Sequence, residues 1–492
     1  MKIGLITVYF GLFDEALPPT FRQERNDLNK KIEDGLSVYG QIVNPGLIDN
    51  EKSALNANQL FIEENLNVLV YAPTMAAPPI YFQKSINNLN IPIMCISPQE
   101  FLVTPEDYDT DAGTEHSTLV GLTMGTNILV REGIDFNVNI LHVDDIPSSK
   151  ELKSFFDSIK TNKAIPSKDI EYKSVIEPKQ SSKVIKAVDT FNKYSLIAIG
   201  DPIDGYLDVE MTNEDADILN LEIKRITKKE LNDTFRSINP KETQNLMNDI
   251  YDNFTQSRKV DNDTMERSCR LSLTIKELTE VHNAIGGTIN CHGDLFRWND
   301  EIGITGCLGV SCLADEGKLF SCTGDIPTSI ALISAKIISG SALYCECYTI
   351  DFENDTILIA NGGEGDSSIN FNEPNLRILP EDHYMGSNGP GVAVQFNINE
   401  MDATLISITP TYINKKREWR IILAEGRVLD SKHHNMEGPN TMFKFNTRSA
   451  VESFQDWASL GATHHAVLMP GHQKEEFKAF TDLIDIKLKV VQ

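Results

Sequence analysis

The sequence has few basic residues for its acidic content. Its 492 residues include 45 Lys and Arg against 71 Asp and Glu, which gives a formal net charge of −26 at pH 7. Proteins that bind a nucleic-acid backbone or an anionic membrane surface need clustered Lys and Arg. We therefore expect no nucleic acid and no membrane as partners, whereas a cation or a neutral polyhydroxylated substrate would meet no such repulsion.

Long apolar runs and paired cysteines are also missing. No apolar segment is long enough to span a bilayer, and the eight cysteines lack the paired spacing of a metal site. Residues 3–13 are apolar like a signal peptide, but Asp14 and Glu15 stand where cleavage would occur, and residues 4–8 are typical of a first β-strand. We expect reduced, buried thiols and a cytoplasmic protein.

A dinucleotide-binding G-x-G-x-x-G is absent after this first strand. Short apolar strands instead alternate with amphipathic helices, and strands are predicted at 2–8, 41–43, 67–71, 91–96 and 137–143. Such alternation requires crossover connections, which favour a parallel sheet covered on both faces. We predict an N-terminal α/β domain over residues 1–172.

The polar, Lys-rich stretch 167–183 predicts a domain boundary, and a second α/β domain is expected over residues 173–342. In residues 343–492, short predicted strands, among them 419–423 and 427–430, are separated by Gly, Asn and Pro. This pattern is typical of an antiparallel barrel or sandwich. The predicted fold class is α/β, with two doubly wound parallel-sheet domains followed by a β-rich, barrel-like C-terminal domain.

The stretch from 319 to 366 holds the densest polar groups set within apolar segments. A short strand stops at Thr323-Gly324-Asp325, and Pro327 stands where the first turn of a helix tolerates a missing N–H. The next strand carries Glu346 between two cysteines. A carboxylate in so apolar a strand costs free energy unless a metal ion, an Arg or a substrate meets it. A core Arg or an edge position is the plain alternative to a functional site.

Segments in this half of the chain resemble the L-arabinose isomerase and L-fucose isomerase family. ECYTIDF followed by NDTILIANGG (346–363) is similar to the family's metal-ligand strand, and CTGD (322–325) to its CEGD or GEGD turn. GATHHAV (461–467) is similar to the Gly-Gly-x-His-His-x-Val signature, and AEGRVLD (424–430) to a C-terminal strand-turn motif. The order and spacing of these motifs carry the resemblance.

This resemblance implies a carbohydrate isomerase that interconverts an aldose and a ketose through a metal-stabilised enediolate. In such chemistry a divalent cation binds the oxygens on C1 and C2 while a carboxylate moves a proton between these carbons. The family's site has two carboxylates and two histidines, which suit Mn²⁺ or another divalent cation. The resemblance also implies a homo-oligomer, a trimer or a hexamer, in which a neighbouring subunit completes the cleft.

Carried over residue by residue, the family's ligand set is half intact. Glu346 stands where the second carboxylate belongs, and His464 or His465 where the late histidine belongs. Because neighbours on a strand face opposite ways, only one of these histidines is expected to reach the site. Thr323 replaces the first carboxylate and Asn361 the other histidine, and neither can act as a general base near neutral pH.

The candidate site follows from this comparison. We predict Glu346, His464 and His465 as metal ligands, and Glu346 and Asp325 as catalytic residues. The residues predicted to bind substrate are Thr323, Asn361 and His292. For His292, which ends a predicted strand, a structural hydrogen-bonded histidine is the alternative.

Three explanations of the altered ligand set stay open. A weaker metal site would keep Glu346, one histidine and Asn361, with proton transfer by Asp325, Asp366, Glu364 or His292. A site with fewer carboxylates would suit a substrate that carries its own anion, such as a sugar acid or a sulfonated sugar. In the third explanation the protein has lost catalysis, and it binds a sugar or regulates a partner enzyme. Isomerisation of an unusual or modified sugar is the leading prediction.

Overall fold

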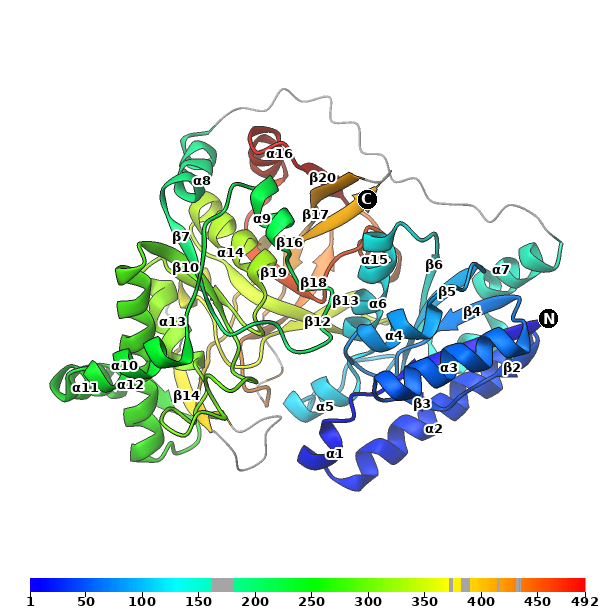
Figure 1. Ribbon diagram of the computed structural model, residues 1–492, viewed down its shortest axis with the longest axis horizontal. Helices are drawn as coiled ribbons and strands as arrows, with labels where there is room; N and C mark the ends of the chain where they lie inside the picture. Colours follow the sequence, from blue (N-terminus) through cyan, green and yellow to red (C-terminus); the bar gives the residue numbers. More distant parts are fainter. Residues whose placement is uncertain are drawn as a thin grey trace.

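The structure is a computed structural model that describes residues 1–161, 181–370, 375–381, 390–413, 416–430, 433 and 435–491. The predicted domain boundary at residues 172 and 173 lies outside these residues. An N-terminal unit (residues 1–161, blue to cyan) and a central unit (residues 181–342, mostly green) lie on opposite sides of the molecule, with strands of the C-terminal part between them (Figure 1).

The N-terminal unit is built on parallel strands, β1 (Lys2–Val8), β2 (Gln41–Val43), β3 (Leu47–Ile48), β4 (Val68–Tyr71), β5 (Ile93–Gln99) and β6 (Asn137–His142). Their order is β2-β1-β4-β5-β6, with β3 paired to the end of β1. The connecting helices are α1 (Phe13–Ala16), α2 (Pro19–Leu36), α3 (Glu51–Glu64), α4 (Ile80–Ile86), α5 (Thr110–Glu115), α6 (Thr118–Glu132) and α7 (Lys150–Lys160). Leu28 of α2 and Phe156 of α7 belong to one core cluster, whereas Phe61 of α3 and Leu122 of α6 belong to another. Helices therefore cover both faces of the sheet, as in a doubly wound fold.

The central unit repeats this arrangement with β7 (Ser195–Ile199), β8 (Ile223–Arg225), β10 (Ala284–Ile289) and β11 (Leu319–Ser321), which form a parallel sheet in the order β11-β10-β7-β8. Its helices are α8 (Ser182–Lys193), α9 (Asn213–Ile218), α10 (Lys228–Ser237), α11 (Pro240–Asn253), α12 (Asn262–Val281), α13 (Cys307–Asp315) and α14 (Ile326–Ser339). Val184 of α8 and Ile330 of α14 pack on one face of the sheet, and Leu231 of α10 and Ile275 of α12 pack on the other.

The C-terminal part is a closed antiparallel barrel of six strands, β12 (Leu343–Asp351), β13 (Thr356–Ala360), β18 (Asn440–Phe445), β17 (Lys416–Val428), β16 (Met401–Ile413) and β19 (His465–Pro470). β20 (Lys487–Val490) adds a parallel strand to β17, and a small sheet is formed by β9 (Thr255–Gln256), β14 (Arg377–Glu381) and β15 (Gly391–Gln395). Two helices, α15 (Ala450–Ser459) and α16 (Lys474–Leu483), flank the barrel. The predicted fold class is confirmed.

The prediction of two separate strands at 419–423 and 427–430 was wrong. Both lie in the single long strand β17, which pairs with β16 from Lys416 to Val428. Gly426, read from the sequence as a break, lets β17 lie against β18, because a Cβ at this position would meet the carbonyl oxygen of Lys444 at 2.4 Å. This glycine therefore serves close strand packing rather than a turn.

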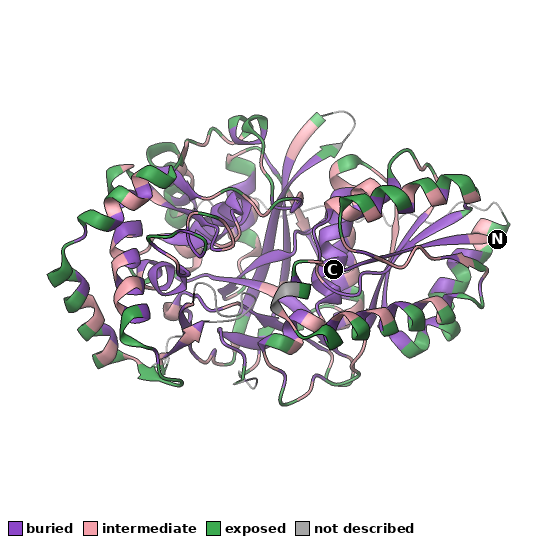
Figure 2. Ribbon diagram, turned by 60° about the horizontal axis from the view of Figure 1, so that its bottom comes forward, coloured by how far each residue is buried: buried purple, intermediate pink, exposed green. Residues whose placement is uncertain are grey.

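Helix α6 joins the N-terminal unit to the barrel. The side-chain amide of Asn127 donates hydrogen bonds to Oγ1 of Thr409 (3.0 Å) and to the carbonyl oxygen of Gly461 (2.7 Å). The strands are mostly buried, while exposed residues follow the outer faces of the helices (Figure 2). No described helix is both long and apolar enough to cross a membrane.

Candidate metal centre

Strand β12 carries the central carboxylate of the site. Side chains on a strand alternate between its two faces. Tyr344, Glu346 and Tyr348 accordingly line a cavity, while Cys345 and Cys347 lie in the hydrophobic core. The thiols and the carboxylate are thus on opposite faces, as the sequence pattern predicted.

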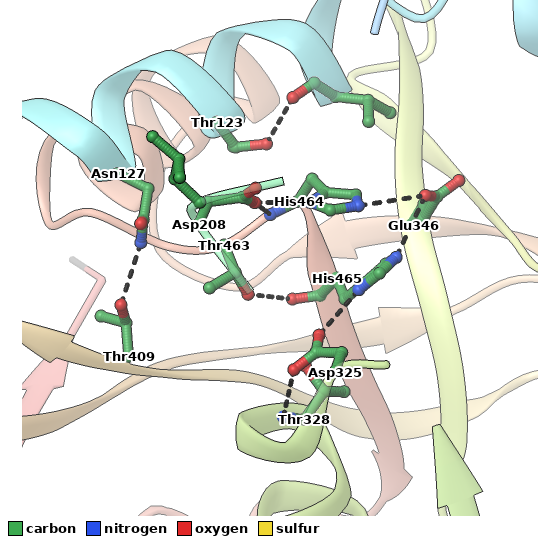
Figure 3. Close-up of polar contacts among 12 residues, drawn as sticks. Thr123, Asn127, Asp208, Asp325, Thr328, Glu346, Thr409, Thr463, His464 and His465 are labelled. Carbon is green, nitrogen blue, oxygen red and sulfur yellow. Dashed lines mark hydrogen bonds and ion pairs between the residues drawn. The ribbon is translucent and has the colours of Figure 1, made fainter. Parts of the chain in front are cut away.

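Both neighbouring histidines face this carboxylate. β19 begins at His465 and pairs with β12 so that His465 lies opposite Glu346. Nε2 of His465 is 3.5 Å and Nε2 of His464 is 3.9 Å from Oε1 of Glu346 (Figure 3). The expectation that only one histidine reaches the site was wrong, because His464 precedes the strand and is not bound by strand alternation.

A buried carboxylate holds the far nitrogen of each imidazole. Nδ1 of His464 lies 2.5 Å from Oδ2 of Asp208, and Nδ1 of His465 lies 2.7 Å from Oδ2 of Asp325. Both aspartates are fully buried. Each carboxylate accepts a hydrogen bond from Nδ1–H, so Nε2 is the nitrogen that each imidazole directs at Glu346.

Each aspartate is itself held by the fold. Asp325 is the N-cap of α14, and it accepts hydrogen bonds from the backbone N–H (2.8 Å) and the hydroxyl (2.6 Å) of Thr328. Asp208 lies on a loop of the central unit. The guanidinium of Arg131, from α6, donates to the carbonyl oxygens of Leu207 (2.8 Å), Asp208 (2.5 Å) and Glu210 (3.0 Å) on this loop. The N-terminal unit therefore fixes the loop that orients His464.

The charges of the cluster offset one another. Burial by itself would raise the pKa of Glu346. The neighbouring His465 and His464 have the larger effect, so the pKa of Glu346 is lowered. Burial acts to lower the pKa of His465, but Asp325 and Glu346 raise it to about 10. Burial likewise opposes the charge of Asp208, yet its pKa is lowered because His464 lies beside it. Glu346 is thus kept ionised, half-buried beside the two imidazoles, where a cation could take the place of the proton on His465.

The side chains of Glu346, His464 and His465 fit a divalent cation. Their ligand atoms all lie within 4.8 Å of one another. The 3.5 and 3.9 Å separations from Glu346 are longer than a good hydrogen bond. These side chains would hold a cation through one carboxylate oxygen and two imidazole nitrogens. Two imidazoles and one carboxylate suit a first-row transition metal better than Ca²⁺ or Mg²⁺.

The cluster lines a cavity of about 200 Å³ that all three parts of the chain enclose. The central unit contributes His292 and Thr323, from the loops after β10 and β11. The N-terminal unit contributes Phe10 and Met75, from the loops after β1 and β4. Such loops at the carboxyl ends of parallel strands are where open α/β sheets place ligands.

Thr323, predicted to bind substrate, lines the cavity in a strained conformation. Its φ is +56°, in the left-handed region that β-branched residues rarely adopt. Its buried hydroxyl has no hydrogen-bond partner within the part of the chain that the structure describes. The turn thus holds a polar atom at the cavity that a ligand could satisfy. His292 lines the same cavity.

Asn361 and Asp325 lie differently with respect to the cavity. Asn361 lines the cavity, but its Oδ1 accepts from the N–H groups of Gly363 (2.7 Å) and Glu364 (2.9 Å), and its Nδ2 donates to the carbonyl of Tyr344 (2.9 Å). Its side chain therefore shapes the turn that presents Glu364. Asp325 lies behind His465, so it contacts the imidazole rather than the cavity (Figure 3).

Of the four proton carriers considered from sequence, Glu364 has the most suitable environment. It lines the cavity, and burial together with the nearby charge of Glu381 raises its pKa to about 7. Nη2 of Arg297 donates to both carboxylate oxygens of Glu381 (2.7 and 2.9 Å), and both residues are buried. Asp366 is instead held by Lys336 (2.8 and 2.9 Å).

Asp208 and Tyr344 were missed by the sequence analysis. Asp208 lies more than 250 residues before His464, in a loop without a motif, so no local pattern connects the two. Tyr344 could have been found, because it stands two residues before Glu346 and therefore on the same face of the strand.

Comparison with known proteins adds to this picture. Residues 341–487 match the family model of the L-arabinose isomerase C-terminal domain. This match indicates a sugar isomerase, and the matched residues include Glu346, His464 and His465. The C-terminal part of the chain therefore belongs to the arabinose isomerase family, which confirms for residues 341–487 the resemblance read from the sequence.

Two other comparisons add little. Curated protein sequences gave no match. A solved structure that is similar in part is the periplasmic solute-binding protein of an ABC transporter from Actinobacillus succinogenes 130z with bound D-allose. Its identity is 12%, over 68% of this chain and 91% of that chain, and its TM-score of 0.16 is too low to carry an argument.

Proposed function

We propose that the protein is an aldose–ketose isomerase that works with a divalent cation, Mn²⁺ by first choice. The observation that carries this proposal is the convergence of Glu346, His464 and His465 on one point of the cavity wall, with a buried carboxylate behind each imidazole. This donor pattern is characteristic of metal sites whose ligands are oriented in advance.

Glu346, His464 and His465 would hold the cation. When bound, it would supply positive charge that stabilises the oxygen on which negative charge develops during isomerisation. Asp208 and Asp325 hold Nδ1 of the two imidazoles, so that Nε2 is the nitrogen in position to bind the cation, which would displace any proton there. We assign Asp325 this positioning role in place of the catalytic role expected from sequence.

Glu364 is the residue that we propose to move the proton between C1 and C2. It lines the same cavity as Glu346, and its raised pKa of about 7 allows it to take up and release a proton near neutral pH. Thr323 cannot replace it, since a hydroxyl is not a base at this pH. Thr323 and His292 would contact substrate hydroxyls instead.

The experiment combines metal content with turnover. Purified protein should contain or take up about one Mn²⁺ per chain and convert at least one aldose of a panel into its ketose. The variant Glu346→Gln should lose metal and turnover while its circular dichroism stays unchanged. If Glu346→Gln turns over like the wild type, the proposed site is wrong.

A non-catalytic sugar-binding homologue is the second candidate, and one observation favours it. Thr323 and Asn361 stand at two positions where the family has metal ligands, and Asn361 is engaged within the protein. Sugar binding without metal uptake and without ketose would support this candidate. We also propose self-association, as a trimer or hexamer, which light scattering would measure.

A further inference from the structure

Two cysteines of the central unit meet at the cavity. Cys291 follows β10 and Cys322 follows β11, and these two strands are parallel neighbours in which Thr288 is paired with Ser321. The carboxyl ends of the strands therefore lie at the same edge of the sheet. Both cysteine side chains line the cavity. The fold thus brings together two thiols that are far apart in the sequence.

The two thiols interact directly. The pKa of the Cys322 thiol is raised well above its usual value, first by a side-chain hydrogen bond with Cys291 and next by burial. Cys322 therefore keeps its proton near neutral pH and donates it towards the sulfur of Cys291. Cys291 is buried and Cys322 is half-buried, so a small reagent would reach the pair through the cavity.

The sulfur of Cys291 also lies at the start of a helix. It accepts a hydrogen bond from the backbone N–H of Gly306 (3.1 Å), which is the N-cap of α13. An N–H donor at the positive end of a helix stabilises the negative charge that a sulfur carries when it attacks an oxidant. Cys291 therefore has the surroundings of an attacking thiolate, and Cys322 stands where a second thiol would complete the reaction.

A third thiol of the cavity has a different partner. Cys307 lines the cavity, but a side-chain hydrogen bond joins it to Glu364. Burial raises the pKa of the Cys307 thiol well above its usual value. Cys307 is therefore a suitable comparison for the Cys291–Cys322 pair, because it faces the same cavity without taking part in the pair.

The turn after Cys322 leads directly to the metal cluster. Asp325, whose carboxylate holds Nδ1 of His465 (2.7 Å), donates its backbone N–H to the carbonyl of Cys322 (3.1 Å). The turn has little room to adjust, because a Cβ on Gly324 would meet the backbone nitrogen of Pro202 at 2.4 Å. A displacement of Cys322 should therefore be passed on to Asp325 and, through it, to His465.

We propose that Cys291 and Cys322 form a redox-active dithiol, which closes to a disulfide when a hydroperoxide such as hydrogen peroxide enters the cavity, and that this closure weakens the metal site. The formation of the disulfide goes beyond the proposed function and does not depend on it. Only the effect on the metal site rests on the proposed cation.

The reaction balances with hydrogen peroxide as the oxidant. The thiolate of Cys291 attacks one peroxide oxygen, the O–O bond breaks, and the hydroxide that leaves takes up the proton released by Cys291. The sulfur of Cys322 then attacks the resulting sulfenic acid, the S–O bond breaks, and the hydroxyl group leaves as water with the proton of Cys322. The two thiols lose two electrons, and one peroxide becomes two waters. A dithiol reductant reverses the bond by exchange.

Peroxide treatment of the full-length, metal-free protein tests the dithiol. The oxidised wild type should lose the two thiols of the pair from its eight cysteines. Mass spectrometry of the digested protein should find the peptides that contain Cys291 and Cys322 joined, and a dithiol reductant should separate them. If no thiols are lost, or if the joined peptide contains Cys307 in place of either residue, the proposal is overturned.

Three variants sharpen this test. Cys291→Ser and Cys322→Ser should each abolish the joined peptide, whereas Cys307→Ser, at the same cavity, should keep it. Loss of the joined peptide in Cys307→Ser alone would overturn the assignment of the pair. Because the joined peptide is first sought in the wild type, a variant that does not fold leaves the main result unaffected.

Calorimetric titration with Mn²⁺, after removal of the peroxide, tests the link to the metal cluster. The oxidised wild type should bind Mn²⁺ at least about fivefold more weakly than the reduced protein, as expected for two coupled sites. Reduction should restore the affinity, and peroxide should leave the affinity of Cys322→Ser unchanged. Equal affinity of the two forms of the wild type would refute the link. If neither form binds Mn²⁺, the proposed metal site and the link are both refuted, while the joined peptide still decides the dithiol.

Discussion

Replacing Asp208 by Asn tests whether the site is built for a metal ion. The carboxylate of Asp208 accepts from Nδ1 of His464 (2.5 Å) and from its backbone N–H (3.3 Å). Asparagine has nearly the same shape but only one oxygen and no charge. The imidazole of His464 would lose the partner that fixes which nitrogen carries the proton, so Nε2 would be a poorer ligand.

The expected loss is large enough to measure. Residues that orient metal-bound histidines typically contribute 10- to 100-fold to metal affinity, which corresponds to about 1.4–2.7 kcal/mol. The loop should keep its place, because Arg131 binds the backbone carbonyls of Leu207, Asp208 and Glu210 rather than the Asp208 side chain. We therefore expect a weaker Mn²⁺ site in a protein with little change in melting temperature.

Calorimetric titration of chelator-treated protein with Mn²⁺ measures this effect. Asp204→Asn is the matched control, since Asp204 is an exposed residue of the same loop and should leave the affinity unchanged. If Asp208→Asn binds Mn²⁺ as tightly as the wild type and the control, His464 is not a metal ligand and our reasoning about the site fails.

Three further predictions concern the same cavity. Asp325→Asn should weaken Mn²⁺ binding through His465 with little change in melting temperature, because Asn caps a helix about as well as Asp; unchanged Mn²⁺ affinity in a calorimetric titration would leave Asp325 only the capping role. Glu364→Gln should remove a pH dependence of the folding stability. Burial raises the pKa of Glu364 from 4.5 to about 7, so on raising the pH the unfolded chain releases this proton before the folded chain does. The free energy of unfolding of the wild type should therefore fall by about 3 kcal/mol between about pH 5 and pH 8. Urea unfolding at both pH values should show this loss in the wild type and a flatter profile in Glu364→Gln, and parallel profiles would contradict the assignment. Thr323→Gly should relieve the strain of the positive φ and stabilise the protein by about 1 kcal/mol, yet weaken sugar-alcohol binding; destabilisation measured by urea unfolding would argue against strain at this turn.

The order of strands and helices could be predicted from the sequence because it depends on local patterns. Alternation of apolar strands with amphipathic helices is enough to indicate doubly wound sheets, and the run of short strands after 343 indicates a barrel. The position of Glu346 was also predictable, since a carboxylate among apolar residues of a strand is costly unless it meets a cation. In contrast, Gly426 was misread as a break, because only the neighbouring strand shows why a side chain is excluded there.

The sequence by itself determined the element order, the barrel and the candidate ligands Glu346, His464 and His465. Only the tertiary structure decided that both histidines face the carboxylate, that Asp208 and Asp325 stand behind them, and that loops of the N-terminal unit line the cavity. The physical reason is distance along the chain. Local patterns report which face a side chain takes, whereas these contacts join residues 140 and 256 positions apart, and only packing brings them together.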